Sequence, residues 1–316
     1  MARPNLRSRI VTGTFSLPAV AAFVALLWLV HGVLDGKFWA GLGATAVITY
    51  LLVELNNRNA LLRIRSRMMG CTFLVLYSAL PFLHDWDVGY IVAGSLLMSY
   101  FTLFASYGES RNSGRIFYAF AFVGLSSLFY PPYALVALAF FVSMLFQLRI
   151  LTVRNFWASL FGYVLPYWLV GAWHLWQGDF MAWVASLLQS WHFALPHLAE
   201  LPAHVLGAFV VVAGLTFIAM MHYKNTAYND KIKVRMFFYT IITVEVLLLL
   251  GCVFLSSDHD ILLRLLALNS APLLAHHLSL ARGRGSDIWF YTSLCIIIAL
   301  GIFNYFGLWS NLFNFS

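Results

Sequence analysis

Long apolar runs separated by short polar segments dominate this chain. Eleven of these runs approach the length of about 20 apolar residues that a membrane-crossing helix needs. They cover residues 15–34, 38–55, 69–84, 88–107, 116–130, 132–148, 156–175, 203–222, 236–256, 261–280 and 287–308. The pattern predicts an all-α fold, a polytopic integral membrane bundle of about eleven transmembrane helices. We expect residues 1–316 to form a single transmembrane domain.

One polar interval, at about residues 176–202, contains a shorter amphipathic pattern. Its apolar residues recur at the spacing of one helix face: Phe180, Trp183, Val184, Leu187, Leu188 and Trp191. This segment is too short to span a bilayer. It therefore predicts an interfacial helix at about 179–192, lying in the plane of the outer headgroups. Such a helix is either a lid over an outer cavity or a structural belt.

The composition indicates that lipid is the solvent for most of the surface. The chain is 62% hydrophobic and 10% charged, whereas soluble domains carry about 25% charged residues. The net charge of +7 comes from short clusters between apolar runs, with no extended basic arm, which argues against a nucleic-acid partner. The three cysteines lie inside apolar runs and are interpreted as packing residues.

The basic clusters predict the orientation. With a cytoplasmic N-terminus, the inner segments hold 17 of the 19 Lys and Arg residues, and only Lys37 and Arg264 lie elsewhere. This asymmetry follows the rule that cytoplasmic loops are positive, so the bundle is expected to be N-in and C-out.

Two Asp-x-Asp pairs occur in predicted outer loops, Asp85 with Asp87 and Asp258 with Asp260. They have two interpretations. Each pair precedes an apolar helix, where Asp is a favoured N-cap, and Asp260 is spaced for an ion pair with Arg264. Alternatively, the pairs offer hard oxygen ligands to Mg²⁺ or Mn²⁺, with Asp85 and Asp87 as the metal ligands.

The second interpretation defines a candidate outer site if the two loops meet. Its catalytic candidates are Asp85, Asp87, Asp258, Asp260 and Arg264, and its substrate-binding candidates include His84, Trp86 and His259. Asp-x-Asp in an outer loop resembles the acidic motif of polyprenol-dependent membrane glycosyltransferases. That resemblance implies glycosyl transfer to or from a lipid-linked glycan. The first outer loop here is short, however, whereas that class carries its motif in a large first outer loop.

A further candidate lies within the lipid zone. Glu245 stands in the middle of an apolar run, and intramembrane carboxylates mark function by default. Asn269, at the same predicted depth on the next helix, is a candidate binding residue, and Asn269 or Ser270 is a candidate partner of Glu245. Pro272 is expected to break that helix beside a cavity, as in transporters.

The histidines match no metal-binding motif. His276 and His277 are adjacent and point in different directions from a helix, so they are interpreted as interfacial side chains.

The stretch 124–173 resembles a family of polytopic Bacteroidota inner-membrane proteins of uncharacterised activity. The resemblance rests on a Leu-Phe-Tyr-x-Pro turn at 128–132, on Arg149, on the helix entry at 154–157, and on Gly162 followed by Pro166-Tyr167. It implies a multi-pass protein of a Gram-negative inner membrane and supplies no catalytic residues.

Three functions follow as hypotheses. The first is an enzyme-like protein acting at the extracytoplasmic face on a lipid-linked envelope glycan precursor. The second is a transporter or lipid flippase that uses Glu245. The third is a non-catalytic membrane subunit that docks other envelope or secretion proteins. All three have the lipid bilayer as their surroundings.

Overall fold

The computed structural model describes residues 6–32, 36–108, 112–191, 201–255, 259–281 and 284–309. Within these ranges the chain is helical and contains no strand. The helices are α1 (Leu6–Thr12), α2 (Ser16–Gly32), α3 (Gly36–Asn59), α4 (Met68–Ser78), α5 (Val88–Ala105), α6 (Ser113–Phe129), α7 (Leu135–Val142), α8 (Val153–Gln177), α9 (Phe180–Gln189), α10 (Ala203–Thr226), α11 (Ile232–Phe254), α12 (His259–Leu280) and α13 (Arg284–Tyr305).

Six of the described helices are long and apolar enough to cross a membrane. They cover Phe38–Asn59, Val88–Ala105, Ala203–Asn229, Ile232–Phe254, His259–Leu280 and Gly285–Tyr305. Other predicted spans contain shorter apolar helices, such as Met68–Ser78. The all-α, multi-pass character is thus confirmed, while the count of eleven and the orientation stay predictions.

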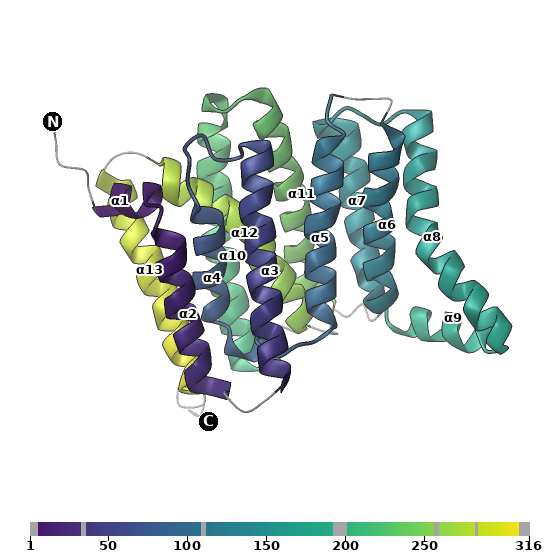
Figure 1. Ribbon diagram of the computed structural model, residues 1–316, viewed down its shortest axis with the longest axis horizontal. Coiled ribbons are helices and arrows are strands. Elements are labelled where there is room, and N and C mark those ends of the chain that lie inside the picture. Colours follow the sequence, from purple (N-terminus) through teal and green to yellow (C-terminus); the bar gives the residue numbers. More distant parts are fainter. Residues whose placement is uncertain are drawn as a thin grey trace. The chain divides into compact units, whose positions relative to one another are not determined.

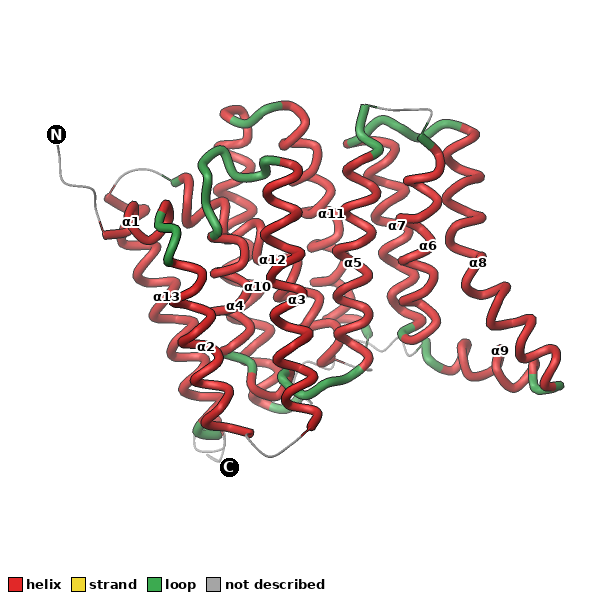
Figure 2. Tube along the Cα trace, in the orientation of Figure 1, coloured by secondary structure: helices red, strands yellow, loops and turns green. Residues whose placement is uncertain are grey.

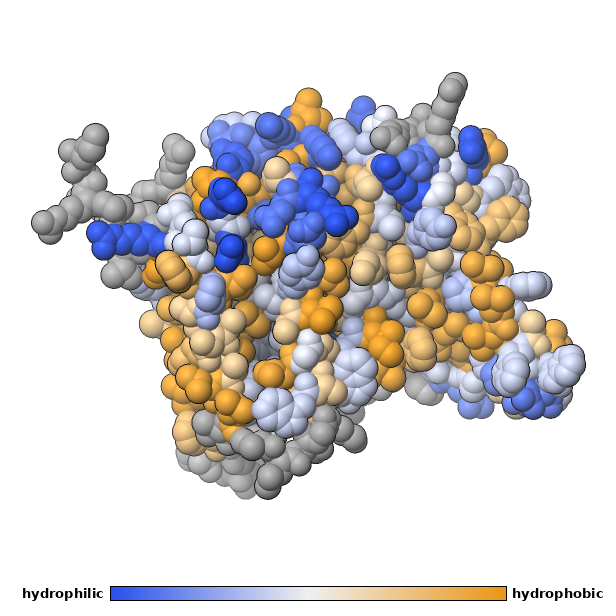
Figure 3. Space-filling view, viewed as in Figure 1, coloured by the Kyte–Doolittle hydropathy of each residue, from blue (hydrophilic) through white to orange (hydrophobic). Residues whose placement is uncertain are grey.

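The chain divides into two compact units. Unit 1 comprises Met1–Tyr90, Leu198–Lys231 and Leu263–Ser316, and unit 2 comprises Ile91–His197 and Ile232–Leu262. In unit 1, α4 packs against both α2 and α3, and α10 packs against α13 (Figure 1). Phe23 and Leu26 on α2 are 61% and 62% exposed, and Figure 3 shows apolar side chains over this part of the unit. Such a surface is suited to lipid.

Prolines explain why several helices are short. α4 ends at Ser78, and Pro81 opens a 3₁₀ turn, Pro81–Leu83, at the end of the predicted span. Similarly, α6 ends at Phe129, and a 3₁₀ turn at Pro131–Ala134 leads into α7. Proline has no backbone N–H, so neither turn can continue the preceding helix.

Pro272 behaves differently. α12 runs without interruption from His259 to Leu280 with Pro272 inside it, so the predicted break is wrong. Most of this helix is buried, and the hydroxyl of Thr216 on α10 donates to Ser270 Oγ at 2.7 Å, two residues before the proline. Packing on all sides keeps the helix continuous despite the hydrogen bond that Pro272 removes.

In unit 2, α6 and α8 lie side by side with their backbones in close contact (Figure 1). A β-carbon at Gly124 on α6 would meet the carbonyl oxygen of Tyr163, and one at Gly162 on α8 would meet that of Phe117. The contact is therefore reciprocal, with one glycine on each helix. Small residues of this kind allow close helix packing in membranes.

Figure 2 shows that α8 bends part-way along its length, and Pro166 lies inside it. The helix ends at Gly178, which adopts a left-handed conformation with φ 80° that suits glycine. α9 follows at once within the range predicted for the interfacial helix, and Figure 1 shows it lying across the end of α8. None of its residues is buried.

We predict that Gly124→Ala and Gly162→Ala each destabilise the protein by roughly 1–3 kcal/mol, because the added methyl group meets backbone atoms that cannot move alone. Thermal unfolding in detergent measures the loss. Gly94→Ala is the matched control, since a β-carbon there has no neighbour within 4 Å in the described structure. Equal melting temperatures for all three variants would contradict the close contact.

Candidate functional site

A buried arginine organises the predicted outer site. Arg264 on α12 is 2% exposed. Its Nε donates to the hydroxyl of Tyr77 at 2.9 Å, its Nη2 donates to the carbonyl of Leu83 at 2.8 Å, and its Nη1 pairs with Asp87 Oδ1. The guanidinium also lies 4.3 Å from the ring centroid of Tyr90, a cation–π contact. All of these residues belong to unit 1.

The partners of Arg264 are also connected to one another. Tyr77 donates its hydroxyl hydrogen to the Leu83 carbonyl at 2.6 Å, so its oxygen remains free to accept from Arg264. A β-carbon at Gly89 would overlap Nη1 of Arg264, which explains a glycine there. This network is the kind of pairing that a buried charge requires. It also leaves Arg264 engaged with protein groups and poorly placed to bind a substrate phosphate.

The predicted ligands His84 and Trp86 have contrasting environments. His84 is 4% exposed and stacks on Trp28 with 3.8 Å between ring centroids. Its Nε2 lies 3.2 Å from the carbonyl of Tyr77. Trp86 is 42% exposed and stacks on Tyr90, beside Arg264. His84 is therefore a packed core residue, whereas Trp86 remains open to a ligand.

The remaining acidic candidates lie at exposed positions or outside the described residues. Asp85 is exposed, and Asp260 is exposed one turn before Arg264 on α12, with His259 partly exposed beside it. Asp258 lies outside the described residues. Among the residues that the structure describes, no three His, Cys, Asp or Glu side chains form a group that could hold a metal ion. The salt bridge that the structure shows for Arg264 is with Asp87.

The intramembrane candidates lie in different units. Glu245, on α11 in unit 2, is fully buried and lies within electrostatic range of Tyr100, which in turn interacts with Tyr133. Tyr100 and Tyr133 are each about 2% exposed. Asn269 is equally buried on α12, in unit 1. Glu245 is thus enclosed with tyrosine side chains in the core of unit 2.

A buried polar cluster in unit 1 went unrecognised in the sequence. Asp230 has a fully buried side chain, and its Oδ2 lies 3.0 Å from Nε2 of His276 on α12. Its Oδ1 lies 2.7 Å from Nε of Arg63, an ion pair without hydrogen-bond alignment. His277 stacks on His222 of α10 at 4.1 Å between centroids. His276 and His277 are buried within unit 1, whereas His222 is partly exposed.

The two stacked rings cannot chelate one metal ion. A metal lies in the plane of each imidazole that binds it, at about 2.0–2.1 Å from nitrogen for zinc. The planes of His222 and His277 are within 9° of parallel, so they do not converge on a common ion. The contacts of Asp230 with Arg63 and His276 connect the segments that carry Arg63 and Asp230 to α12, so the cluster is interpreted as structural.

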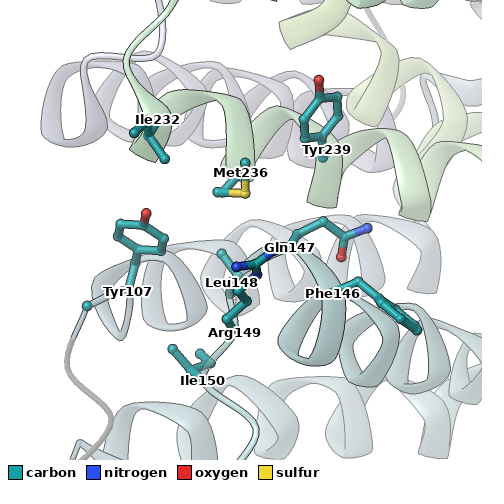
Figure 4. Close-up of a pocket in the computed structure, with 10 residues that line it drawn as sticks. Tyr107, Phe146, Gln147, Leu148, Arg149, Ile150, Ile232, Met236 and Tyr239 are labelled. Atoms are coloured by element: carbon teal, nitrogen blue, oxygen red, sulfur yellow. The ribbon is translucent and has the colours of Figure 1, made fainter.

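A cavity of unit 2 lies elsewhere (Figure 4). It has a volume of about 660 Å³ and lies between the end of α5, the turn after α7, and the start of α11. The ten lining residues are Tyr107, Gly108, Phe146, Gln147, Leu148, Arg149, Ile150, Ile232, Met236 and Tyr239. Typical ligand pockets measure about 300–1,000 Å³ and combine apolar walls with a few polar groups. The volume of this cavity falls within that range.

Irregular backbone shapes its lower wall. α7 continues as a π-helical turn, Ser143–Gln147, in which the N–H of Leu148 donates to the carbonyl of Ser143 at 2.8 Å. Arg149 then adopts a left-handed conformation with φ 53°. Single π-turns occur frequently at functional sites, and left-handed conformations in non-glycine residues are uncommon. Figure 4 shows the Arg149 side chain extending toward Met236 on α11.

Comparisons with known proteins give no relatives for this chain: no family model, no curated protein and no solved structure matches it. Functional inference therefore rests on the residues and their geometry.

We predict that Asp87→Asn lowers the stability of the folded protein by roughly 1–2 kcal/mol, because the buried Arg264 cation loses the charge of a carboxylate that is itself 41% exposed. Asp85→Asn, at an exposed position, should leave the melting temperature unchanged. If the outer loop instead carries catalytic carboxylates, Asp85→Asn would abolish activity at unchanged stability, and this pair of variants separates the two roles.

A second stability prediction concerns the contacts of Asp230 with Arg63 and His276. Asp230→Asn should lower the melting temperature by several degrees, because His276 and Arg63 lose a buried anion. The control is Glu54→Gln, which breaks an ion pair with Arg58 whose Arg side chain is 68% exposed. Such i,i+4 surface pairs contribute only about 0.3–0.5 kcal/mol. If the melting temperature falls no further in Asp230→Asn than in Glu54→Gln, the contacts of Asp230 have no structural role.

Proposed function

We propose that this protein is a multi-pass membrane transporter of the flippase type, which takes up an anionic amphiphile such as a lipid-linked envelope precursor. The cavity of unit 2 is its binding site, and Glu245 couples the movement to protons. The observation that carries the proposal is that one helix, α11, both lines the cavity and buries the carboxylate.

The lining residues determine the class of ligand. Seven of them provide apolar or aromatic side chains, which suit an acyl or prenyl chain. Arg149 supplies a cation, and the described lining contains no acidic residue. An amphiphile with an anionic oxygen group satisfies both features, since guanidinium groups are preferred partners of phosphates.

The predicted orientation assigns the cavity to the cytoplasmic side. Arg149, Lys231, Lys233 and Arg235 belong to inner segments in the N-in arrangement. A precursor made in the cytoplasm would enter from that side. The proposed membrane is the bacterial inner membrane, on the strength of the resemblance over residues 124–173.

Glu245 is the residue that would couple the movement of the ligand to the movement of protons. It lies six residues beyond Tyr239 along α11, which corresponds to roughly 9 Å of helix. A carboxylate buried in the lipid zone costs several kcal/mol unless it is paired or protonated, so its proton occupancy responds to its surroundings. Ligand entry next to α11 can therefore change the protonation state of Glu245, and proton flow can drive the ligand across.

Glycosyl transfer at the outer loops is the second candidate function. The exposed Asp85 and the half-exposed Trp86 favour it, because both remain available to a ligand. The engagement of Arg264 and Asp87 with each other counts against it, since two of its predicted catalytic groups are then structural.

We predict that Glu245→Gln abolishes proton-dependent lipid transfer while the protein stays folded. The assay follows fluorescent phosphatidylglycerol in proteoliposomes, with a pH gradient and with a chemical quencher outside. Glu54→Gln is the control, because it neutralises another glutamate on a membrane-crossing helix and retains the buried one.

Two outcomes would contradict the proposal. Equal transfer in empty vesicles and in protein-containing vesicles would remove the transport activity. Unchanged pH-dependent transfer in Glu245→Gln would remove the coupling role and leave Glu245 as a structural hydrogen-bonding residue.

A further inference from the structure

A groove in unit 2 lies between α8 and α9 (Figure 1). It has a volume of about 420 Å³. Six of its lining residues lie on α8, between Val164 and Leu175, and four lie on α9, between Phe180 and Leu187. Its lining shares no residue with that of the cavity beside α11, so the two are separate sites.

Local features of the sequence shape this groove. α8 bends part-way along its length, with Pro166 inside it (Figure 2), and the chain turns into α9 at Gly178, whose φ of 80° suits glycine. A β-carbon at Gly171 would lie 3.2 Å from the ring of Trp183 and 3.4 Å from that of Phe180. Glycine at this position therefore allows α9 to approach α8 closely, and the groove is present without a ligand.

The walls of the groove are apolar, which determines the kind of molecule that fits it. The lining consists of aliphatic and aromatic side chains together with a glycine. The hydroxyl of Tyr167 donates to Ser127 Oγ on α6 at 2.9 Å, so its hydrogen is used within the protein. At the edges of the groove, Trp168 and Leu175 are 66% and 63% exposed. The groove is thus continuous with a surface suited to lipid, and a hydrocarbon chain of the bilayer is the matching occupant.

An exposed carboxylate lies beside the groove. Asp179 directly precedes the lining residue Phe180 and occupies the N-cap position of α9, yet its side chain makes no capping hydrogen bond within the described turn that follows. Its Oδ1 lies 2.9 Å from Nδ1 of His174, whose ring stacks on Trp183 with 5.2 Å between centroids. The side chain of Asp179 is 52% exposed. Because a carboxylate accepts several hydrogen bonds, Asp179 can accept another from a lipid headgroup.

The charge of Asp179 favours one class of headgroup. A carboxylate attracts an ammonium group and forms charge-assisted hydrogen bonds with its N–H donors. It repels the phosphate of a headgroup that carries no cation. Phosphatidylethanolamine has such an ammonium group, whereas phosphatidylglycerol has a phosphate and neutral hydroxyl groups. The first of these two lipids therefore matches both the apolar groove and the acidic group beside it.

We propose that the α8–α9 groove binds a phospholipid of the surrounding bilayer, with one acyl chain in the groove and the ammonium group of an ethanolamine headgroup on Asp179. This site is additional to the cavity of the proposed function, and it requires no transport activity. The bound lipid gives α9, none of whose residues is buried, an apolar partner besides α8.

Photo-crosslinking in proteoliposomes of the full-length chain tests the site. The probes are phosphatidylethanolamine and phosphatidylglycerol with the same diazirine-bearing acyl chain, each diluted into phosphatidylcholine, and mass spectrometry maps the crosslinked peptides. Labelling of the groove is divided by labelling around Val210 and Phe217, which are 59% and 56% exposed on α10 and report ordinary lipid contact. This ratio should be about two- to fivefold higher for phosphatidylethanolamine, the factor that an exposed ion pair contributes.

Two variants separate the acyl chain from the headgroup. Ala172→Phe fills the groove, so labelling of the groove by both probes should fall severalfold. Its control is Ala182→Phe, which adds the same ring at an exposed position of α9 that is not part of the lining. Asp179→Asn removes the charge and keeps a favoured N-cap residue, so the preference for phosphatidylethanolamine should disappear while the helix remains.

Equal ratios for the two probes in the wild-type protein would overturn the proposal, and so would unchanged labelling of the groove in Ala172→Phe. If Ala172→Phe fails to fold, the comparison of the two probes in the wild-type protein and in Asp179→Asn still decides. An unlabelled groove, together with disulfide-linked dimers of Ala172→Cys in a variant whose exposed Cys295 is replaced by Ser, would assign the groove to a second copy of the chain. Failure of lipid transfer would remove the proposed function and leave this result unchanged.

Discussion

The burial of one guanidinium constrains much of unit 1. Arg264 is a charge placed on one of the most enclosed helices of the chain, and such a charge is tolerated only when every part of it is paired. Its partners come from the end of α4, from the turn that follows and from the segment leading into α5. The position of α12 against these segments is therefore determined by directional contacts, in addition to apolar packing.

The apolar runs predicted the helical, multi-pass fold because a bilayer leaves few other ways to satisfy the backbone. A turn at Pro131 was also predicted, since proline acts locally, whereas the predicted span 69–84 ran through Pro81. The continuous helix through Pro272 was not predicted, because tertiary packing on α12 holds the helix together across it. Apart from Pro81, sequence reasoning succeeds here where the cause lies within one helical turn, and it fails where distant segments decide the outcome.

The same limit applies to the polar residues. Spacing suggested Asp260 as a partner of Arg264, and it could not show Asp87, which the fold brings from a segment 177 residues away. Asp230 and His276 form a buried contact although they are 46 residues apart in the sequence, and no local motif predicts it. The cavity of unit 2 depends on a π-turn and on a left-handed Arg149, neither of which produces a hydropathy signal. The sequence predicted an uninterrupted span at 132–148 there.

The reciprocal glycine contact has a mechanical consequence. Because Gly124 and Gly162 each seat against a carbonyl of the opposite helix, sliding α6 past α8 would drive both backbones into collision. The two helices must then move together as one rigid body. The possible hinges of this motion are the 3₁₀ turn at Pro131–Ala134 and the extended connection through Thr152, which lie on either side of α7 and its π-turn. A swing of the α6–α8 pair would thus reach the wall of the cavity through α7 and through Asn155 on α8, whose amide donates to the carbonyl of the lining residue Ile150 at 2.6 Å.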